Sequence, residues 1–467
     1  MPIDPGDPGP TVWANLKDAA IAAINASLAL KLDATTAAAT YSGKADVVYR
    51  VADYANPQAA IDACPAGGVV LFPPFNSPVT TALSVTQLIT FRGNGAFGSR
   101  IFASGCGGVI VAAGVEFHME DIEVALDVRY TTTTNTLVGI KVNGTTGSRP
   151  SNHTYRNVFV DGFKTAFQSG YLWSSNFDNF RCNFGLIGLD IYGLSVNNFV
   201  YGGSEINVAA VTGSRCIRFN GCESATDATA VASEGWDVSD SLLFGAEIAV
   251  EGLATTHVHI HDNIVDFAML YGIKIIDNGG FFGGNWDIHD NYIAMSGVSG
   301  TAAIGCLNAT SNVQNTVNRI HDNHMLTYAG AACTQGVYLY GAYAQSNVRA
   351  NTFRAFTSGD VVMNCGGNDV VGNVCLSAVT SNIFATGTQV NHVEGNDGTV
   401  YLTGGDPNVY AIDAIGHKVY AGLQALTTGT NAWGDRVVNS RPAVGSPKAW
   451  SCTVAGTPGT WVSEGNL

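Results

Sequence analysis

The chain has 467 residues, of which only 13% are charged and 55 are glycine, and this composition excludes a protein built from long charged helices. The formal net charge of -15 argues against a nucleic-acid partner, because phosphate binding requires clustered lysine and arginine. No run is long and apolar enough for a membrane span, and the opening Met-Pro-Ile-Asp-Pro lacks the features of a secretory signal. We therefore expect a soluble β protein that is made in a cytoplasm.

Residues 1–48 predict a proline-rich arm followed by an alanine-rich helix. Four prolines before residue 12 prevent a helix there, while apolar residues from Leu16 to Leu32 form an imperfect helical stripe. So thin a stripe cannot support a domain alone. It fits a short bundle of identical helices around a symmetry axis, or an adaptor to another protein such as a particle component.

The stretch "NPQAAIDACPAGGVVLFPP" at residues 56–74 predicts a short amphipathic helix, a Gly-Gly turn and a strand that two prolines end. A helix in front of a repeat array is a natural cap for its open end.

A phrase centred on Ile-His-Asp-Asn recurs as "VHIHDNIV", "WDIHDNYI" and "NRIHDNHM". Its asparagine continues along the chain at intervals of 28, 32, 28, 22 and 23 residues, and the series is Asn263, Asn291, Asn323, Asn351, Asn373 and Asn396. A second segment with alternating apolar residues follows each phrase, as in "GIKII" and "GVYLY". The pattern predicts an all-β fold, a right-handed parallel β-helix over residues 49–396.

Within each phrase the apolar residues should point inward and the asparagines should stack at a bend, each amide bonding the next. The inward set is Val258, Ile260, Ile288 and Ile320. The aspartates before the asparagines fit turn residues better than catalysts, and they are Asp240, Asp262, Asp290 and Asp322. Ten cysteines occur without any C-x-x-C motif, and we expect reduced, buried thiols, for example at Cys306 and Cys365.

Residues 397–467 lose the period and predict short hairpins with Pro-Gly turns. The segment is too small for an independent domain, so we expect a carboxyl-terminal β cap or a clasp between three chains.

Two stretches resemble known families. The start "QAAIDACPAGGVVLFPP" followed by "LITFRGNGAFGSRI" resembles the start of pectin-lyase-fold proteins, and the ending "VGSPKAWSCTVAGTPGTWVSEGNL" resembles the tail of many bacteriophage tailspikes. The resemblance implies a homotrimer in the virion tail, made in the host cytoplasm and acting at the bacterial surface. It implies binding and cleavage of a capsule or O-antigen polysaccharide, and attachment to a phage tail or baseplate protein through the amino terminus. The amino-terminal region is short for that family, so we expect a large particle-binding domain to be missing or reduced to the helix.

Strand alternation places two columns of side chains outside the repeat array. The first column contains Asp237, His259, Asp287, Arg319, Asn347 and Asp369, and the second contains Ser239, His261, His289, His321 and Arg349. Two coils separate Asp237 from Asp287, or roughly 9 to 10 Å, which is near the upper end for the acid and base of an inverting glycosidase. These residues also fit the solvated surface of a soluble rod.

Trp236 and Trp286 precede these aspartates, and we expect them to stack on sugar or to fill a groove between subunits. The setting "WDVSD" is similar to that of catalytic acids in some tailspike hydrolases. Glu205, about one long coil earlier, is a further candidate carboxylate.

The other strand column also carries charge. Its expected outward members are Lys141, Asp190, Arg218, Ala249, Lys274, Gly305 and Tyr338, with Glu247 and Glu251 beside Ala249. In pectin-lyase-fold enzymes this kind of face commonly bears the substrate groove. Arg218 and Lys274 suit a lyase, which needs a cation for the substrate carboxylate and a base for the C5 proton. Ion pairing to neighbouring acids explains the same residues without catalysis.

His257, His259 and His261 alternate on one strand, and such spacing can hold zinc, but no acidic ligand lies at a telling spacing. We expect a structural or sugar-contacting role, with no metal and no cofactor. The prediction is a polysaccharide hydrolase, with a lyase and a non-catalytic receptor-binding fibre as alternatives.

Overall fold

The computed structural model describes most of the chain after the predicted amino-terminal arm and helix, which lie outside the described residues. The described residues are 48–130, 135–221, 233–276, 284–297, 300–307, 317–341, 346–365, 367–377, 383–385, 391–397, 400–402, 409–412, 417–422, 424–427, 430–439 and 443–467.

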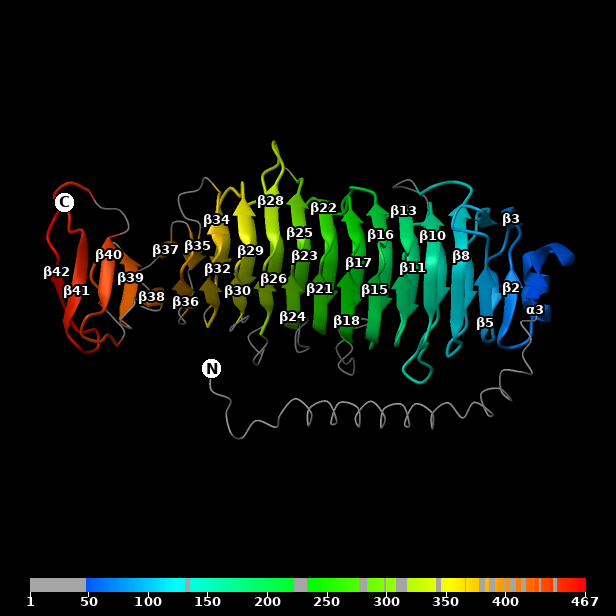
Figure 1. The fold of residues 1–467 in the computed structure, drawn as a ribbon, viewed down its shortest axis with the longest axis horizontal. Coiled ribbons are helices and arrows are strands. Elements are labelled where there is room, and N and C mark those ends of the chain that lie inside the picture. Colours follow the sequence, from blue (N-terminus) through cyan, green and yellow to red (C-terminus); the bar gives the residue numbers. More distant parts are fainter. Residues whose placement is uncertain are drawn as a thin grey trace, which may run out of the picture.

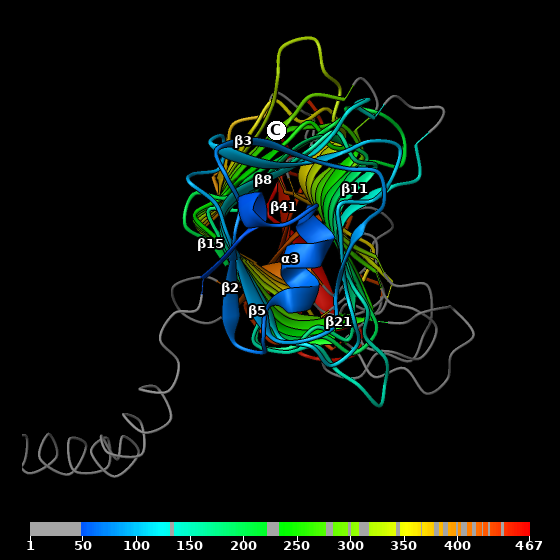
Figure 2. The same ribbon diagram turned by 90° about the vertical axis from the view of Figure 1, so that its right-hand side faces the viewer.

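The chain forms a parallel β-helix, as the sequence predicts. It winds around one long axis, which is horizontal in Figure 1, and successive coils stack their strands in parallel. Figure 2 looks along that axis, with the helix α3 in front of the core and strands on the faces around it. We number three faces in the order in which the chain visits them in each coil.

The first face precedes the asparagine bend. Its strands are β1 (Val48–Arg50), β2 (Gly68–Leu71), β5 (Ile89–Arg92), β8 (Phe117–Leu126), β10 (Thr154–Asp161), β12 (Asn176–Asp178), β15 (Val196–Tyr201), β18 (Ser233–Ser239), β21 (Thr255–His261), β24 (Gly284–His289), β27 (Arg319–His321), β30 (Asn347–Arg349), β33 (Asp369–Val371), β36 (Asn391–Glu394) and β38 (Val409–Ile412).

The second face follows the bend, and β8 and β10 run through the bend into it. Its other strands are β3 (Phe75–Val79), β6 (Ser99–Ala103), β13 (Arg181–Gly185), β16 (Glu205–Val208), β19 (Leu242–Phe244), β22 (Ile264–Ala268), β25 (Tyr292–Met295), β28 (His324–Thr327), β31 (Thr352–Arg354) and β34 (Val374–Cys375).

The third face is a separate sheet of thirteen described strands. They are β4 (Leu83–Val85), β7 (Val109–Val111), β9 (Val138–Val142), β11 (Thr165–Gly170), β14 (Ile187–Tyr192), β17 (Arg215–Asn220), β20 (Ile248–Leu253), β23 (Tyr271–Ile276), β26 (Ala302–Leu307), β29 (Gln335–Tyr340), β32 (Gly359–Met363), β35 (Ile383–Ala385) and β37 (Val400–Leu402).

The alternate residues of each strand build a continuous interior. Val238, Ile260, Ile288 and Ile320 lie in register on neighbouring strands, and each is fully buried. Val258 is fully buried as well, so the predicted inward set is confirmed. Burial of this apolar stack is the main favourable term for the fold, and it leaves the residues between outside.

The asparagine ladder at the bend is confirmed. The Nδ2 of Asn263 donates to the Oδ1 of Asn291 at 3.0 Å, and Asn291 repeats the contact with Asn323. The same contact continues through Asn351, Asn373 and Asn396. Each Oδ1 also accepts from the backbone N–H of the preceding asparagine, so the stacked amides satisfy one another inside the protein.

The predicted cap helix is α3 (Pro57–Ala63), which follows a short 3-10 helix, η1 (Val51–Asp53). It begins where the side chain of Asn56 accepts a hydrogen bond from the Ala59 N–H at 2.9 Å. Ala60 and Ile61 are buried in the main core. The helix therefore covers the apolar end of the array.

At the carboxyl end, parallel pairing continues past residue 396, because β37 pairs with β35 and β38 pairs with β36. The chain then forms β39 (Lys418–Gly422), β40 (Arg436–Asn439), β41 (Ala449–Val454) and β42 (Thr460–Ser463), which include antiparallel hairpins. A separate small core of Tyr420, Leu426 and Val437 holds this end together. Its role as a clasp between three chains stays a prediction.

Nine cysteines lie in the described residues as free thiols, and eight of them are buried, including Cys306 and Cys365 as predicted. Within the described part of the chain, no helix has the length and hydropathy that a membrane span requires.

Candidate functional site

The first candidate site lies outside the first face, on β18, β21, β24 and β27. Asp237 pairs in register with His259, and His259 pairs with Asp287, so the two carboxylates lie two coils apart with His259 between them, as predicted. The side chains of Asp237 and Asp287 are 32% and 20% exposed. Two inter-strand spacings place the two strands about 9 to 10 Å apart. The site thus offers two accessible carboxylates with an exposed imidazole between them.

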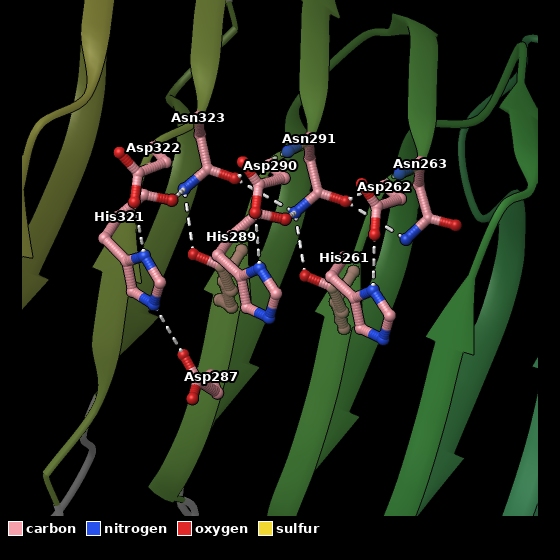
Figure 3. A network of polar contacts seen from close by, with 12 residues as sticks. His261, Asp262, Asn263, Asp287, His289, Asp290, Asn291, His321, Asp322 and Asn323 are labelled. Carbon is pink, nitrogen blue, oxygen red and sulfur yellow. Dashed lines mark hydrogen bonds and ion pairs between the residues drawn. The ribbon is translucent and has the colours of Figure 1, made fainter.

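Three histidine rings stack beside this column, as Figure 3 shows. The ring centroids of His261 and His289 are 4.9 Å apart with 2° between the planes, and those of His289 and His321 are 4.9 Å apart with 5°. The inter-strand spacing of a parallel sheet sets this separation.

An aspartate holds each ring from the bend. The Nδ1 of His261 lies 2.8 Å from Asp262, and the same distance links the other two rings to Asp290 and Asp322. The three aspartates have φ of 55°, 54° and 56°, a left-handed conformation that aspartate tolerates at turns. The predicted turn role is confirmed, and each aspartate additionally orients an imidazole.

The outer two rings of the stack reach the candidate carboxylates. The Nε2 of His261 lies 3.4 Å from Asp237. The Nε2 of His321 lies 3.1 Å from Asp287, a contact that Figure 3 shows. The Nε2 of His289 has no hydrogen bond to any residue that the structure describes. Burial lowers the pKa of His261, but the hydrogen bond to Asp262 and the charge of Asp237 outweigh it, so this pKa is raised.

The prediction that Trp236 and Trp286 offer stacking surface is wrong. Their exposed fractions are 0% and 1%, and both rings lie in the main core against Phe219. The Nε1 of Trp236 donates to Ser233 and that of Trp286 to the Thr255 carbonyl. Since neighbouring residues of a strand face opposite sides, an outward aspartate places the preceding tryptophan inside.

Glu205 does not join Asp237. It lies on β16 of the second face, in register with Arg181 and Leu242, whereas Asp237 lies before the bend on the first face. The inclusion of Glu205 in the same site is therefore wrong.

The third face carries a second charged cluster. Gln168, Asp190, Arg218, Glu251, Lys274, Gly305, Tyr338 and Val362 form one outward column in register. Glu251 holds the place that the sequence assigned to Ala249, and Ala249 is fully buried. Lys141, in register with Gln168, belongs to this column as predicted.

Ion pairs occupy the charged groups of this cluster. Arg218 binds Asp190 at 2.8 Å, and Lys274 lies 3.6 Å from Glu251 and over the ring of Tyr271. Arg215, which sequence reasoning missed, binds both Glu247 and Glu251, at 2.9 and 2.7 Å.

The surroundings of Glu247 and Tyr338 are consistent with a structural role for this cluster. Burial raises the pKa of Glu247, but the Gly213 N–H and the Arg215 guanidinium outweigh it, so the pKa is lowered. Tyr338 accepts a hydrogen bond from Asn364 and packs beside Tyr340. Because each carboxylate here has a bound cation, the ion-pair interpretation describes this face best.

No group of three or more histidine, cysteine or acidic side chains in the described residues has the geometry to hold a metal ion. His257 and His259 remain exposed on β21, and His257 lies 3.8 Å from Glu234.

The sequence matches no family model, and no curated protein matches it. In structure, the chain is similar to the catalytic unit of a GH87 α-1,3-glucanase from Streptomyces thermodiastaticus, at 14% identity and a TM-score of 0.54, over 77% of this chain and 70% of that one. A mannuronan C-5 epimerase A-module from Azotobacter vinelandii aligns at 17% identity and a TM-score of 0.41, over 78% of this chain and 97% of that one. At these identities the likeness concerns the fold, a parallel β-helix.

Proposed function

We propose that this chain is a tailspike-type glycoside hydrolase that binds and cleaves a bacterial capsule or O-antigen polysaccharide. The observation that carries the reaction is the pair Asp237 and Asp287, outward on one face, with His259 in register between them. The fold also serves an α-1,3-glucanase, so glycoside hydrolysis is compatible with it, although function has to be argued from the site. The carboxyl-terminal sequence resembling tailspike tails supports the viral role and the homotrimer.

The two carboxylates have different hydrogen-bonding surroundings. His261 contacts Asp262 and Asp237, and its raised pKa favours an imidazolium beside the Asp237 carboxylate. Asp237 is therefore the proposed general base, which takes a proton from the attacking water.

Asp287 is the proposed general acid. The Oδ1 of Asp287 lies 3.1 Å from the Nε2 of His321, and the Nδ1 of that ring lies 2.8 Å from Asp322, so an imidazole that can exchange a proton contacts this carboxyl. Arg319, 3.6 Å from Asp287, can pair with the carboxylate that remains after the proton has passed to the leaving oxygen. A separation near the upper end of the inverting range leaves room for water between the two groups.

The test measures chain length of purified capsular and O-antigen polysaccharides before and after incubation with the protein. Asp237→Asn and Asp287→Asn should each lower cleavage by several orders of magnitude while the polymer still binds. Asp369→Asn is the matched control, because Asp369 lies outward in the same column and also contacts a histidine, His392, farther along the axis. Inverted configuration at the new reducing end would support the acid and base roles.

Other outcomes separate the alternatives. Full activity of both variants, with Glu247→Gln or Glu251→Gln inactive, would move the reaction to the third face. Products that absorb as unsaturated sugars, with activity lost in Arg218→Ala or Lys274→Ala, would make the enzyme a lyase. Binding without any shortening of the polymer would make the protein a receptor-binding fibre.

A further inference from the structure

An aromatic cluster lies on the second face and takes no part in the site described above. We call Phe244, Phe267, Tyr328 and Asp266 the aromatic platform. The ring of Phe267 lies 5.2 Å from that of Phe244 and 5.1 Å from that of Tyr328, measured between centroids. Phe267 is 44% exposed, so a large apolar ring faces solvent.

The backbone at Phe267 is held in an unfavourable conformation. Its φ is 58°, which is uncommon for a bulky residue, and it lies within a register irregularity between Val265 and Ala268. In the neighbouring coil Phe244 pairs with Asp266, so the residue after it, Gly245, corresponds to Phe267, and its φ is 80°. Since glycine meets the same backbone requirement at no steric cost, the fold itself does not call for phenylalanine here.

Asp266 fixes the platform and can also meet a ligand. Its Oδ1 accepts from the Phe267 N–H at 2.9 Å and from the Tyr328 hydroxyl at 2.7 Å. Its Oδ2 has no hydrogen bond to any residue in the described ranges, and the residue is half-buried. A carboxylate oxygen beside an exposed aromatic ring suits a pyranose, which presents hydroxyl donors at its edge and an apolar face of C–H groups.

The platform spans the stretch of coils that holds the proposed catalytic pair, although the coil of Asp287 contributes none of its four residues. Phe244 follows Asp237 in one coil, Phe267 follows His259 in the next, and Tyr328 follows His321 farther on, each after the asparagine bend. A polymer that crosses the bend can therefore contact both faces at one height along the axis.

We infer that the aromatic platform is an accessory binding site for pyranose units of the polysaccharide, with Phe267 as the stacking surface and Asp266 as the hydroxyl acceptor. The identity of this ligand rests on the proposed function. The site holds the polymer on the second face while the first face cleaves it.

The test uses Phe267→Gly, which removes the ring and relieves the positive φ, so the variant should fold at least as well as the parent protein. Phe75→Gly is the matched control, because Phe75 is also an exposed phenylalanine with positive φ on the second face, far along the axis on β3. Both are combined with Asp237→Asn, so that the polymer is not consumed, and affinity for a purified capsular or O-antigen polysaccharide that the parent protein binds is measured by calorimetry.

We expect Phe267→Gly to bind about tenfold more weakly and Phe75→Gly to bind like its background. Equal affinity for both variants, in a protein that cleaves the polymer, would overturn the platform and leave the proposed function standing. A polymer that is bound but never cleaved, with affinity still lost in Phe267→Gly, would overturn the hydrolase and leave the platform. A fall in molecular mass of Phe267→Gly in light scattering, with binding intact, would assign the ring to contact between copies of the chain and overturn the sugar site.

Discussion

Replacement of Asn291 by leucine should destabilise the protein by breaking the ladder in its middle. The Oδ1 of Asn291 accepts from the N–H and the Nδ2 of Asn263, at 3.1 and 3.0 Å. Its Nδ2 donates to Asn323, and to the carbonyls of Ile260 and His289 at 2.8 Å each. Leucine is close in size to asparagine but forms none of these bonds.

The size of the effect follows from the groups left without partners. The Asn263 N–H loses its acceptor inside the protein, while the Asn263 Nδ2 keeps the Val238 carbonyl at 2.8 Å. An unsatisfied buried group costs about 1 to 3 kcal/mol, so one or two such groups predict a loss of about 1 to 6 kcal/mol. Denaturant midpoints measure it, or unfolding half-lives at one temperature if refolding fails.

The control is Asn347→Leu, in the outward column of β30, where the side chain is half-buried and has no hydrogen bond to any of the described residues. The change retains the backbone N–H, which donates to the Asn318 carbonyl. We expect a change within about 0.5 kcal/mol there. Equal midpoints for the two variants would refute the argument that stacked amides hold the bend.

Three further predictions concern charge and assembly. The pKa of His261 is raised in the folded protein, so protonation of this ring stabilises the fold below the unfolded pKa of about 6.5, and the contribution is lost as pH rises through the folded pKa. His261→Gln should flatten the dependence of the unfolding free energy on pH in that window, and an unchanged dependence would contradict this. Burial lowers the pKa of His153 to about 3, so between neutral pH and pH 5 only the unfolded histidine takes up a proton, and the free energy of unfolding should fall by about 2 kcal/mol. His153→Gln should remove this pH dependence from denaturation curves. Light scattering should give three times the 48.7 kDa chain mass, and active protein at 48.7 kDa would exclude the homotrimer.

Most of the fold could be predicted from the periodicity of apolar residues and asparagines along the sequence. A period of two along each strand identifies the inward residues, and the recurring asparagine identifies where each coil bends, so the core column and the ladder could both be read from the sequence. Trp236 could have been read in the same way, since it adjoins the outward Asp237. The aromatic side chain suggested sugar binding, although the alternation of inward and outward residues along the strand places it inside.

Register and bulges could not be read so directly. Arg218 pairs with Glu251, which contradicts the predicted partner Ala249, because loops of different length separate the strands and only backbone pairing fixes the alignment. Glu205 has a plausible spacing from Asp237 but lies beyond the bend, on another face. Phe267 faces solvent because of an irregularity after Val265 that no hydrophobic pattern signals.

The repeated Ile-His-Asp-Asn phrase has a structural role, and the residues that its histidines contact differ from coil to coil. In all three copies the asparagine closes the bend and the aspartate holds the imidazole Nδ1, so the phrase itself builds the same local structure. What each Nε2 meets depends on the preceding coil. His261 meets Asp237 and His321 meets Asp287, but the corresponding position for His289 is His259, which has no carboxylate. His261 pairs in register with Ser239, and His321 pairs with His289. The proposed base and acid each lie two residues before that partner, so an aspartate at this position in alternate coils supplies the two carboxylates.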